Sequence, residues 1–183
     1  VTVDNDKGVS EILAHLVDQG CRNLVHIAGP ADIYDAVERR RSFERFVART
    51  KGVRGEVLQA SMSREGGKAA VLEYLNRHAG WPDAFIACND PMALGVLEAL
   101  REHGISVPKP IAVTGCDDES SSGFVGLTTL HMPMVELGRE TARLLFDRLE
   151  KKDDAQAGRH SVLGMTLKVR QTSSSAKPGT AQP

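Results

Sequence analysis

The sequence predicts a three-layer α/β domain in which helices cover both faces of a mostly parallel, doubly wound sheet. Short apolar segments alternate with segments of helical periodicity along most of the chain. The segment at 84–87 carries no polar side chain, which is typical of a strand covered on both faces. A strict strand–helix order requires right-handed crossovers, and these place successive strands parallel. At 183 residues, the chain is long enough for one well-buried domain.

The first elements follow from apolar spacing. A strand is expected at 1–3, and a helix follows it because Val9, Ile12, Leu13, Leu16 and Val17 recur at helical spacing. Gly20 then stands where a left-handed helix C-cap belongs. The next strand is expected at 24–28, and a second helix follows with its buried face marked by residues 43, 46 and 47.

The middle of the chain repeats this rhythm. A strand is expected at 56–58 and a helix around 71–75, before the buried strand at 84–87. Asp90 is interpreted as the N-cap of the following helix, with Pro91 at its first position and Gly104 at its end. Another strand is expected at 111–114.

After Gly115 the pattern changes. Residues 116–123 are expected to form a polar loop, followed by a strand at 127–131 and a helix at 133–150. A polar linker is expected at 151–160, and a half-exposed edge strand at 163–169, where apolar and polar side chains alternate. The segment 171–183, rich in Ser, Thr, Ala, Gly and Pro, is expected to be a disordered tail.

Composition limits the function classes. The net charge is −1 and no segment gathers the basic residues, so we expect no nucleic-acid surface on this chain. The three cysteines are far apart and lack the spacing of a disulfide framework or a zinc site, which favours a cytoplasmic location. No apolar run approaches the roughly 18 residues of a membrane span, so no membrane partner is expected. The chain starts without Met and within a strand, as expected of a segment of a longer protein.

Two polar residues follow strands of the predicted sheet. Asn89 follows the strand at 84–87, and Asp117 lies just past the strand at 111–114. Open α/β sheets bind ligands at the carboxyl ends of their strands, beside helix N-termini. With a guanidinium from Arg39, these groups suit a polyhydroxylated ligand, because each binds adjacent hydroxyls in two-pronged fashion. The alternative for Asn89 is that it only closes a turn.

Enzyme signatures are missing. The Gly66-Gly67-Lys68 segment is not a phosphate loop, no G-x-G-x-x-G occurs, and no nucleophile elbow surrounds Ser120 to Ser122. Residues 117–119 are three consecutive acids that could hold a divalent metal, but such acids in a loop are more often solvated. We therefore expect no catalytic residue, no metal and no cofactor.

A series of short motifs points to one family. They are Val3-Asp4-Asn5, Ala28-Gly29-Pro30, Arg39-x-x-Ser42-Phe43, Asn89-Asp90-x-Met92-Ala93-Leu94-Gly95, Gly115-x-Asp117-Asp118, Leu127-Thr128-Thr129-Leu130 and Val169-Arg170-x-Thr172. In this order they resemble the lactose-repressor/galactose-repressor family of transcriptional regulators. The resemblance implies a bacterial regulator whose N-terminal helix-turn-helix binds operator DNA and whose two-lobed, periplasmic-binding-protein-like module binds a small-molecule effector.

On this resemblance, residues 1–170 are the C-terminal part of the effector-binding and dimerisation module, and the helix at 133–150 belongs to the other lobe. Operator DNA would be bound only through the separate N-terminal domain, and the protein would form a homodimer or higher homo-oligomer. The resemblance places a subunit interface at Pro91, Met92, Gly95, Ser120 and Ser121.

The resemblance also implies effector-binding positions. Arg39, Asn89 and Asp117 match positions that line the effector cleft, and Asp35 and Met62 match neighbouring ones. Met132 and Met134 fall beside the return crossover, which faces the same cleft. Met132 departs from the family because a polar residue is frequent there. Methionines suit a ligand of mixed polarity, although each could equally be core filler.

Two other classes remain open. A periplasmic sugar receptor of related fold is the alternative among binding proteins, and the Leu127-to-Leu130 and terminal motifs favour the regulator over it. A small α/β hydrolase would need a nucleophile–base pair, and the sequence offers no such pair.

Overall fold

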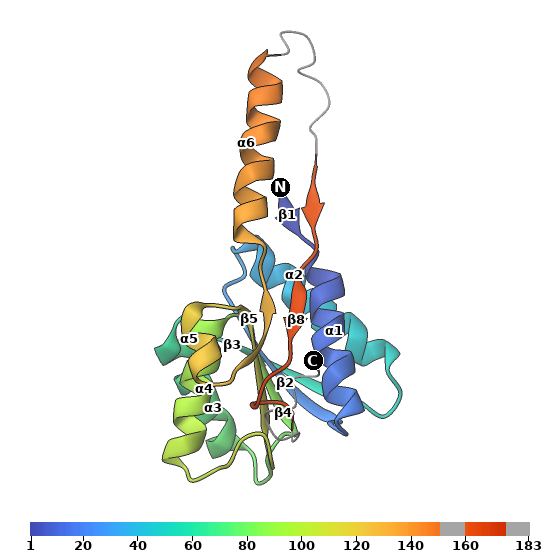
Figure 1. The fold of residues 1–183 in the computed structure, drawn as a ribbon. Helices are drawn as coiled ribbons and strands as arrows, with labels where there is room; N and C mark the ends of the chain where they lie inside the picture. Colours follow the sequence, from blue (N-terminus) through green and yellow to red (C-terminus); the bar gives the residue numbers. More distant parts are fainter. Residues whose placement is uncertain (151–159, 175–183) are drawn as a thin grey trace, which may run out of the picture.

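The structure is a computed structural model that describes residues 1–150 and 160–174 (Figure 1). Its elements are β1 (Thr2–Val3), α1 (Asn5–Asp18), β2 (Asn23–Ala28), α2 (Tyr34–Arg49), β3 (Arg54–Gln59), α3 (Arg64–Arg77), β4 (Ala84–Ala87), α4 (Asp90–Glu102), β5 (Ala112–Asp117), α5 (Ser120–Phe124), β6 (Thr128–His131), α6 (Met134–Glu150), β7 (Val162–Leu163) and β8 (Thr166–Lys168). The predicted alternation of strands and helices is confirmed.

The main sheet has six strands in the order β3-β2-β4-β5-β6-β8. All neighbouring pairs are parallel except β6 and β8, which run antiparallel. Helices α3 and α4 pack over one face and α1 and α2 over the other, as Figure 1 shows for α3, α4 and α1. The predicted three-layer, mostly parallel fold is therefore confirmed.

Two glycines end helices as their positions predicted. Gly20 follows α1 with φ +95°, and Gly104 follows α4 with φ +68°. Both values lie in the left-handed region, where a residue without Cβ is favoured.

The start of α4 differs from the prediction. Asn89, not Asp90, is the N-cap, and its side chain accepts a hydrogen bond from the Met92 amide at 3.1 Å. Asp90 instead begins the helix and is completely buried. Both residue types cap helices well, so the local sequence could not separate them.

The segment after β5 also differs. Residues 116 and 117, expected in a loop, are the last residues of β5, because β6 pairs beside them in parallel. Part of the expected loop is the short helix α5.

The C-terminal segment contributes strands to two separate sheets. The expected strand at 163–169 is split, because β7 pairs with β1 in a separate two-stranded sheet while β8 joins the main sheet. The tail begins later than expected, because Thr172 and Ser173 are buried and the Thr172 hydroxyl donates to the Val113 carbonyl at 2.7 Å. The rest of the expected tail, 175–183, and the expected linker at 151–159 lie outside the described residues.

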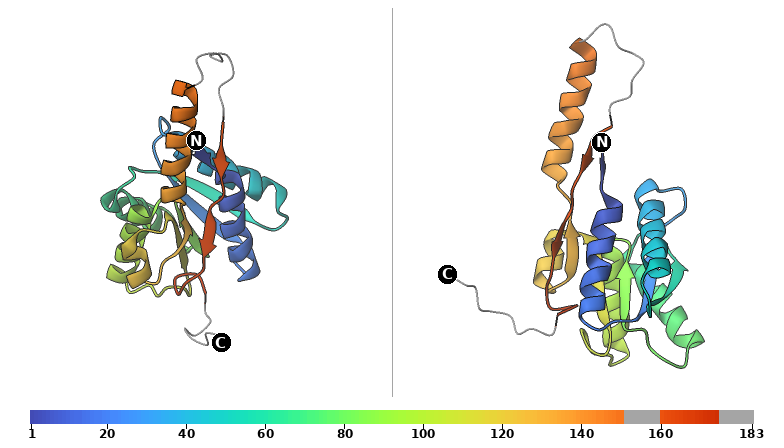
Figure 2. Two further views of the ribbon diagram at one scale, coloured as in Figure 1. Left: turned by 45° about the horizontal axis from the view of Figure 1, so that its top comes forward. Right: turned by 90° about the vertical axis from the view of Figure 1, so that its right-hand side faces the viewer.

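Helix α6 extends away from the main sheet, next to β1 and β7 (Figures 1 and 2). None of its residues is buried. Five of its large apolar side chains are 55–68% exposed, namely Met134, Val135, Leu145, Phe146 and Leu149, whereas Leu137 packs partly buried against the core. Among the residues that the structure describes, no helix combines the length and apolar character needed to cross a membrane.

Candidate functional site

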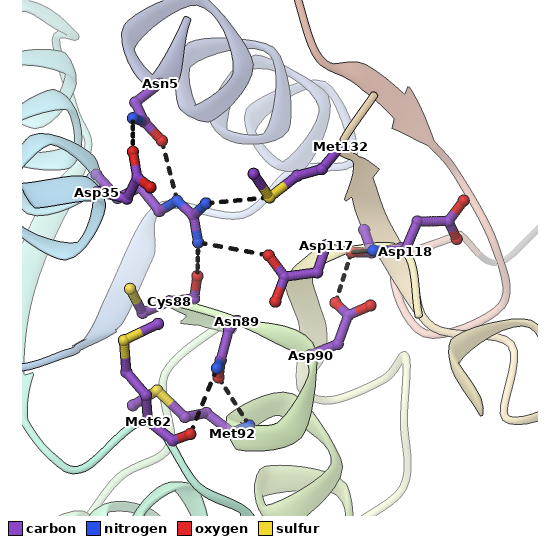
Figure 3. Close-up of polar contacts among 12 residues, drawn as sticks. Asn5, Asp35, Met62, Cys88, Asn89, Asp90, Met92, Asp117, Asp118 and Met132 are labelled. Carbon is purple, nitrogen blue, oxygen red and sulfur yellow. Dashed lines mark hydrogen bonds and ion pairs between the residues drawn. The ribbon is translucent and has the colours of Figure 1, made fainter. Parts of the chain in front are cut away.

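A polar cluster lies at the carboxyl ends of β4 and β5 (Figure 3). Asn89 follows β4, Asp117 ends β5, and Arg39 reaches the same place from α2. Parallel strands end at a common edge of the sheet, so residues far apart in sequence meet there.

Arg39 is the centre of this cluster and is only 3% exposed. Its Nε donates to Asn5 Oδ1 at 3.0 Å, and its Nη1 donates to the Cys88 carbonyl at 2.6 Å. Nη1 also lies 3.8 Å from Asp117 Oδ1, and Nη2 lies 3.6 Å from the Met132 sulfur. The guanidinium is thus fixed on two sides by strong acceptors, whereas its Nη2 faces only a weak thioether acceptor.

Asn5 is a member of the cluster that sequence reasoning missed. Besides accepting from Arg39, it donates from Nδ2 to Asp35 Oδ1 at 2.8 Å, so it links Asp35 to the guanidinium. Asn5 is the first residue of α1, and the strand before it, β1, pairs with β7 outside the main sheet. The rule on strand ends of one sheet therefore does not identify it.

Both the oxygen and the nitrogen of the Asn89 side-chain amide have partners within the chain. Its Oδ1 caps α4, and its Nδ2 lies 3.4 Å from the Met62 carbonyl oxygen. The turn-closing alternative therefore describes part of what this side chain does. The second contact is long for a hydrogen bond, so the Nδ2 group is the part of Asn89 that a ligand could most readily recruit.

Asp117 has an unusual electrostatic and backbone environment. Burial raises the pKa of its carboxyl to about 6, although the Arg39 guanidinium acts in the opposite direction. Its φ is +131° and that of Asp118 is +58°, both rare for residues with a side chain. Strained backbone of this kind persists only where the surroundings hold it, and it gathers at functional sites.

The methionines are divided between two regions. Met132 contacts Arg39, and Met62 packs against Gly29, where an added Cβ would lie 2.8 Å from Met62 Cγ. Met134 begins α6 and is 66% exposed. Its backbone amide donates to the Met132 carbonyl at 2.8 Å. Within the described part of the chain, however, no hydrogen bond joins its side chain to Arg39, Asn89 or Asp117, so the structure does not bring that side chain together with theirs.

Two of the residues expected at a subunit interface are inside the chain, which corrects the prediction. Met92 is completely buried, and Gly95 is so close to the Arg64 carbonyl of α3 that no Cβ would fit. Both serve the contact between α3 and α4. Pro91, Ser120 and Ser121 keep some exposure.

Phe124 is the last residue of α5 and ends the 118–124 segment, which the resemblance places near the subunit interface together with the start of α4. It is 93% exposed. The structure thus places a large apolar side chain at the surface of this segment.

The consecutive acids 117–119 are separated by their partners. Asp117 faces Arg39, whereas Asp118 Oδ1 accepts from Arg170 at 2.7 Å and its Oδ2 lies 3.1 Å from His131 Nδ1. These two ion pairs lower the pKa of Asp118 against the effect of its burial. Within residues 1–150 and 160–174, no group of three His, Cys, Asp or Glu side chains is arranged to hold a metal ion.

Comparison with known proteins decides the family. A model of the periplasmic binding protein-like domain matches residues 13–173. The chain belongs to the periplasmic binding protein-like domain family. Among relatives of this domain, the transcriptional regulator CelR of Thermobifida fusca is 34% identical over 153 residues, covering 81% of this chain and 45% of the relative. The transcriptional repressor PurR of Haemophilus influenzae is 32% identical over 144 residues, covering 76% and 43%.

Solved structures agree with these relatives. The CelR–cellobiose complex is 32% identical, with a TM-score of 0.85, covering 93% of this domain and 53% of that chain. The lac repressor dimer bound to operator and the anti-inducer ONPF is 26% identical, with a TM-score of 0.83 and coverages of 93% and 59%. The resemblance to the lactose-repressor/galactose-repressor family is confirmed. The domain spans about half the length of the curated relatives it matches.

Proposed function

We propose that this chain is the effector-sensing and dimerising part of a bacterial transcriptional regulator. It binds a small polar metabolite, a sugar or related molecule, and thereby modulates operator binding by an N-terminal helix-turn-helix. The observation that carries the proposal is the meeting of Arg39, Asp117 and Asn89 at the carboxyl edge of the sheet. The relatives support it, because they are regulators and one was solved with cellobiose.

The chemistry of the cluster fits such a ligand. A carboxylate accepts hydroxyl protons, a guanidinium donates to hydroxyl oxygens, and an amide does both. Met62 and Met132 add apolar, polarizable surface, which suits the C–H face of a sugar ring or a ligand of mixed polarity. Asp35 completes the set through Asn5.

Binding is tested by calorimetry on the full chain with a panel of neutral mono- and disaccharides that includes cellobiose and ribose. Asp117→Asn and Arg39→Met should weaken the binding of any sugar that the wild type takes up by tenfold or more, through the loss of charge-assisted hydrogen bonds of about 1–3 kcal/mol. Arg40→Met is the matched control, because Arg40 lies on the same helix and its side chain is 47% exposed beside Glu44. Equal affinities for all four proteins would contradict the proposed site.

The proposed protein is a regulator and not an enzyme. The Ser122 hydroxyl, on α5 after β5, donates to Asp90 at 2.5 Å and not to a histidine. Acyl transfer needs a nucleophile, a base that takes its proton and a third group that orients the base, and a serine bonded directly to a carboxylate is not such a series. Turnover of generic ester or phosphate substrates that Asp90→Asn abolishes would overturn this part.

A homodimer or higher homo-oligomer is part of the same proposal, with its contact at α5. The exposed Phe124 lies beside Ser120, Ser121 and the exposed Val125, and aromatic side chains are enriched among the residues that dominate protein–protein contacts. We propose a cytoplasmic location because operator DNA is the target of such a regulator. The three free cysteines are compatible with that compartment.

A further inference from the structure

Asp90 is a carboxylate buried without exposure at the first position of α4, next to Asn89. Its Oδ2 accepts from the Ser122 hydroxyl at 2.5 Å and from the Glu119 backbone amide at 3.0 Å. Its Oδ1 accepts from the Thr129 hydroxyl at 2.6 Å. A buried carboxylate is costly unless it is fully hydrogen-bonded, so a residue of this type needs a reason that packing alone does not give.

All three donors come from the chain that follows β5. That chain begins with the Asp117–Asp118 turn, in which both residues have positive φ. A residue with a Cβ is disfavoured in such a conformation, and here two follow one another. Something outside the turn must hold it.

The backbone amides of the turn are hydrogen-bonded to Asp90, either directly or through Thr129. The Glu119 amide donates to Asp90 directly, and the Asp118 amide lies 3.4 Å from Thr129 Oγ1, whose own proton goes to Asp90. The carboxylate also lies over β5, because a Cβ on Gly115 would collide with Asp90 Oδ1. Figure 3 shows Asp90 beside Asp117 and Asp118.

We propose that Asp90 is a positioning residue that holds the Asp117–Asp118 turn in its left-handed conformation and thereby keeps the Asp117 carboxylate facing Arg39. The inference rests on the proposed function in that it takes Asp117 as a ligand-binding group. The hold itself exists in the ligand-free chain. It also ties the turn to α5, since Ser122 belongs to that helix.

Arg170 and His131 act on the same turn in a different way. Arg170 and His131 contact the side chain of Asp118. Asp90 instead holds the backbone amide of Glu119 directly, and that of Asp118 through the Thr129 hydroxyl. Loss of the Arg170 contact would therefore free the Asp118 side chain, whereas loss of the Asp90 contacts would free the backbone that orients Asp117. The two roles can be separated because only the second changes the environment of the Glu119 backbone amide.

The test compares Thr129→Val with Thr114→Val in the full chain. Thr129→Val keeps the side-chain shape and the charge of Asp90 but removes the hydroxyl that connects Asp118 to Asp90. Thr114→Val is the matched control: Thr114 is equally buried on neighbouring β5, and its hydroxyl has no hydrogen-bond partner among the described residues.

Two ligand-free readouts follow by NMR: hydrogen exchange of the Glu119 amide, and the pH titration of the Asp117 carboxyl carbon. In Thr129→Val we expect at least tenfold faster exchange and a titration midpoint shifted down, because the released carboxyl gains water. Thr114→Val should match the wild type in both. Asp90→Leu, which has a similar volume and no acceptor, should accelerate the exchange further.

Identical exchange and titration in the Thr129→Val and Thr114→Val proteins would overturn the proposal, as would wild-type protection of Glu119 in Asp90→Leu. Thr129→Val keeps the test valid if Asp90→Leu does not fold. Neither readout needs a sugar. A wild type that binds no sugar but shows the expected exchange pattern would therefore refute the proposed function and leave the positioning role of Asp90 standing.

Discussion

Arg39 and Asp117, 78 positions apart in the sequence, face each other with 3.8 Å between Nη1 and Oδ1. The guanidinium is 4% exposed and the carboxylate side chain 28%, so one partner is enclosed and the other faces outward. A ligand that reaches Asp117 therefore meets a carboxylate already oriented by a buried cation. The pair is the basis for the predictions on this site.

Asp117→Asn should stabilise the fold at neutral pH while weakening ligand binding. The pKa of the carboxyl rises from 3.8 to about 6 on folding, so its stability contribution is fully present below pH 3.8 and is lost as the pH rises through 6. The penalty above pH 6 is about 3 kcal/mol at most. Chemical denaturation should show the variant more stable than the wild type at pH 7.5, with the difference vanishing near pH 4. A variant less stable than the wild type at pH 7.5 would contradict this.

His26 should make the fold sensitive to acid. It is buried against Phe43, its Nδ1 lies 2.9 Å from the Ile86 carbonyl, and burial lowers its pKa from 6.5 to about 4. A lowered pKa means that stability is fully present above pH 6.5 and is lost as the pH falls through 4, by about 3 kcal/mol in total. Asp117 acts in the opposite sense over the same range, so the two effects partly cancel in the wild type.

The His26 effect is therefore measured in the Asp117→Asn background. There, the free energy of unfolding should fall steeply between pH 6.5 and 4, and adding His26→Phe should flatten that slope. His103→Gln, at an exposed position, is the control and should leave the slope unchanged. An equal slope with and without His26 would exclude this histidine as the cause.

Asn5→Ala should affect both stability and binding. It leaves Arg39 Nε without its partner and Asp35 without its buried donor, at a cost of about 1–3 kcal/mol. Thermal unfolding and sugar titration check the two effects separately. Asp6→Ala, one position along α1 with a side chain 61% exposed, should change neither by a comparable amount.

Phe124→Ser should weaken self-association. The 93% exposed ring offers the largest apolar contact on α5, and truncating an aromatic at an interface hot spot costs about 2 kcal/mol, about a thirtyfold change in dissociation constant. Light scattering over a dilution series measures it, with Trp81→Ser as a control at another exposed aromatic. An unchanged series would remove α5 from the interface.

The distal part of helix α6 is expected to be covered in the assembled protein, because Leu145, Phe146 and Leu149 are 55–68% exposed, whereas Leu137 near its start packs against the core. The proposed domain organisation assigns this helix to the other lobe, so a second copy would cover it in an assembly of this chain alone. Leu145→Ser with Leu149→Ser should lower the assembled fraction and speed hydrogen exchange along the helix. A monomer whose α6 exchanges slowly would show that these side chains are buried within one chain.

Much of the fold was predictable because periodicity reports burial directly. The apolar segment at 84–87 is enough to predict strand β4, and the helical spacing from Val9 to Val17 is enough to predict helix α1. The approach of Asn89 and Asp117 was also predictable from the rule that parallel strands end at one edge, whereas Arg39, on α2, was placed there by the resemblance.

What was missed depends on partners distant in sequence. Asp90 looked like a cap, but Ser122 and Thr129 bury its carboxylate. Met92 and Gly95 looked available to a partner subunit, but α3 packs on them. The split of the last strand depends on β1, which lies at the opposite end of the chain. None of these partners can be read from the local pattern.

A crystal structure of the full chain with a sugar identified by the calorimetric panel decides whether Arg39, Asn89 and Asp117 bind the effector. We expect ring hydroxyls within hydrogen-bond distance of the Asp117 carboxylate, the Arg39 guanidinium and the Asn89 amide, with Met132 or Met62 against the ring. A sugar bound elsewhere, with Arg39 and Asp117 making only the contacts described above, would contradict it.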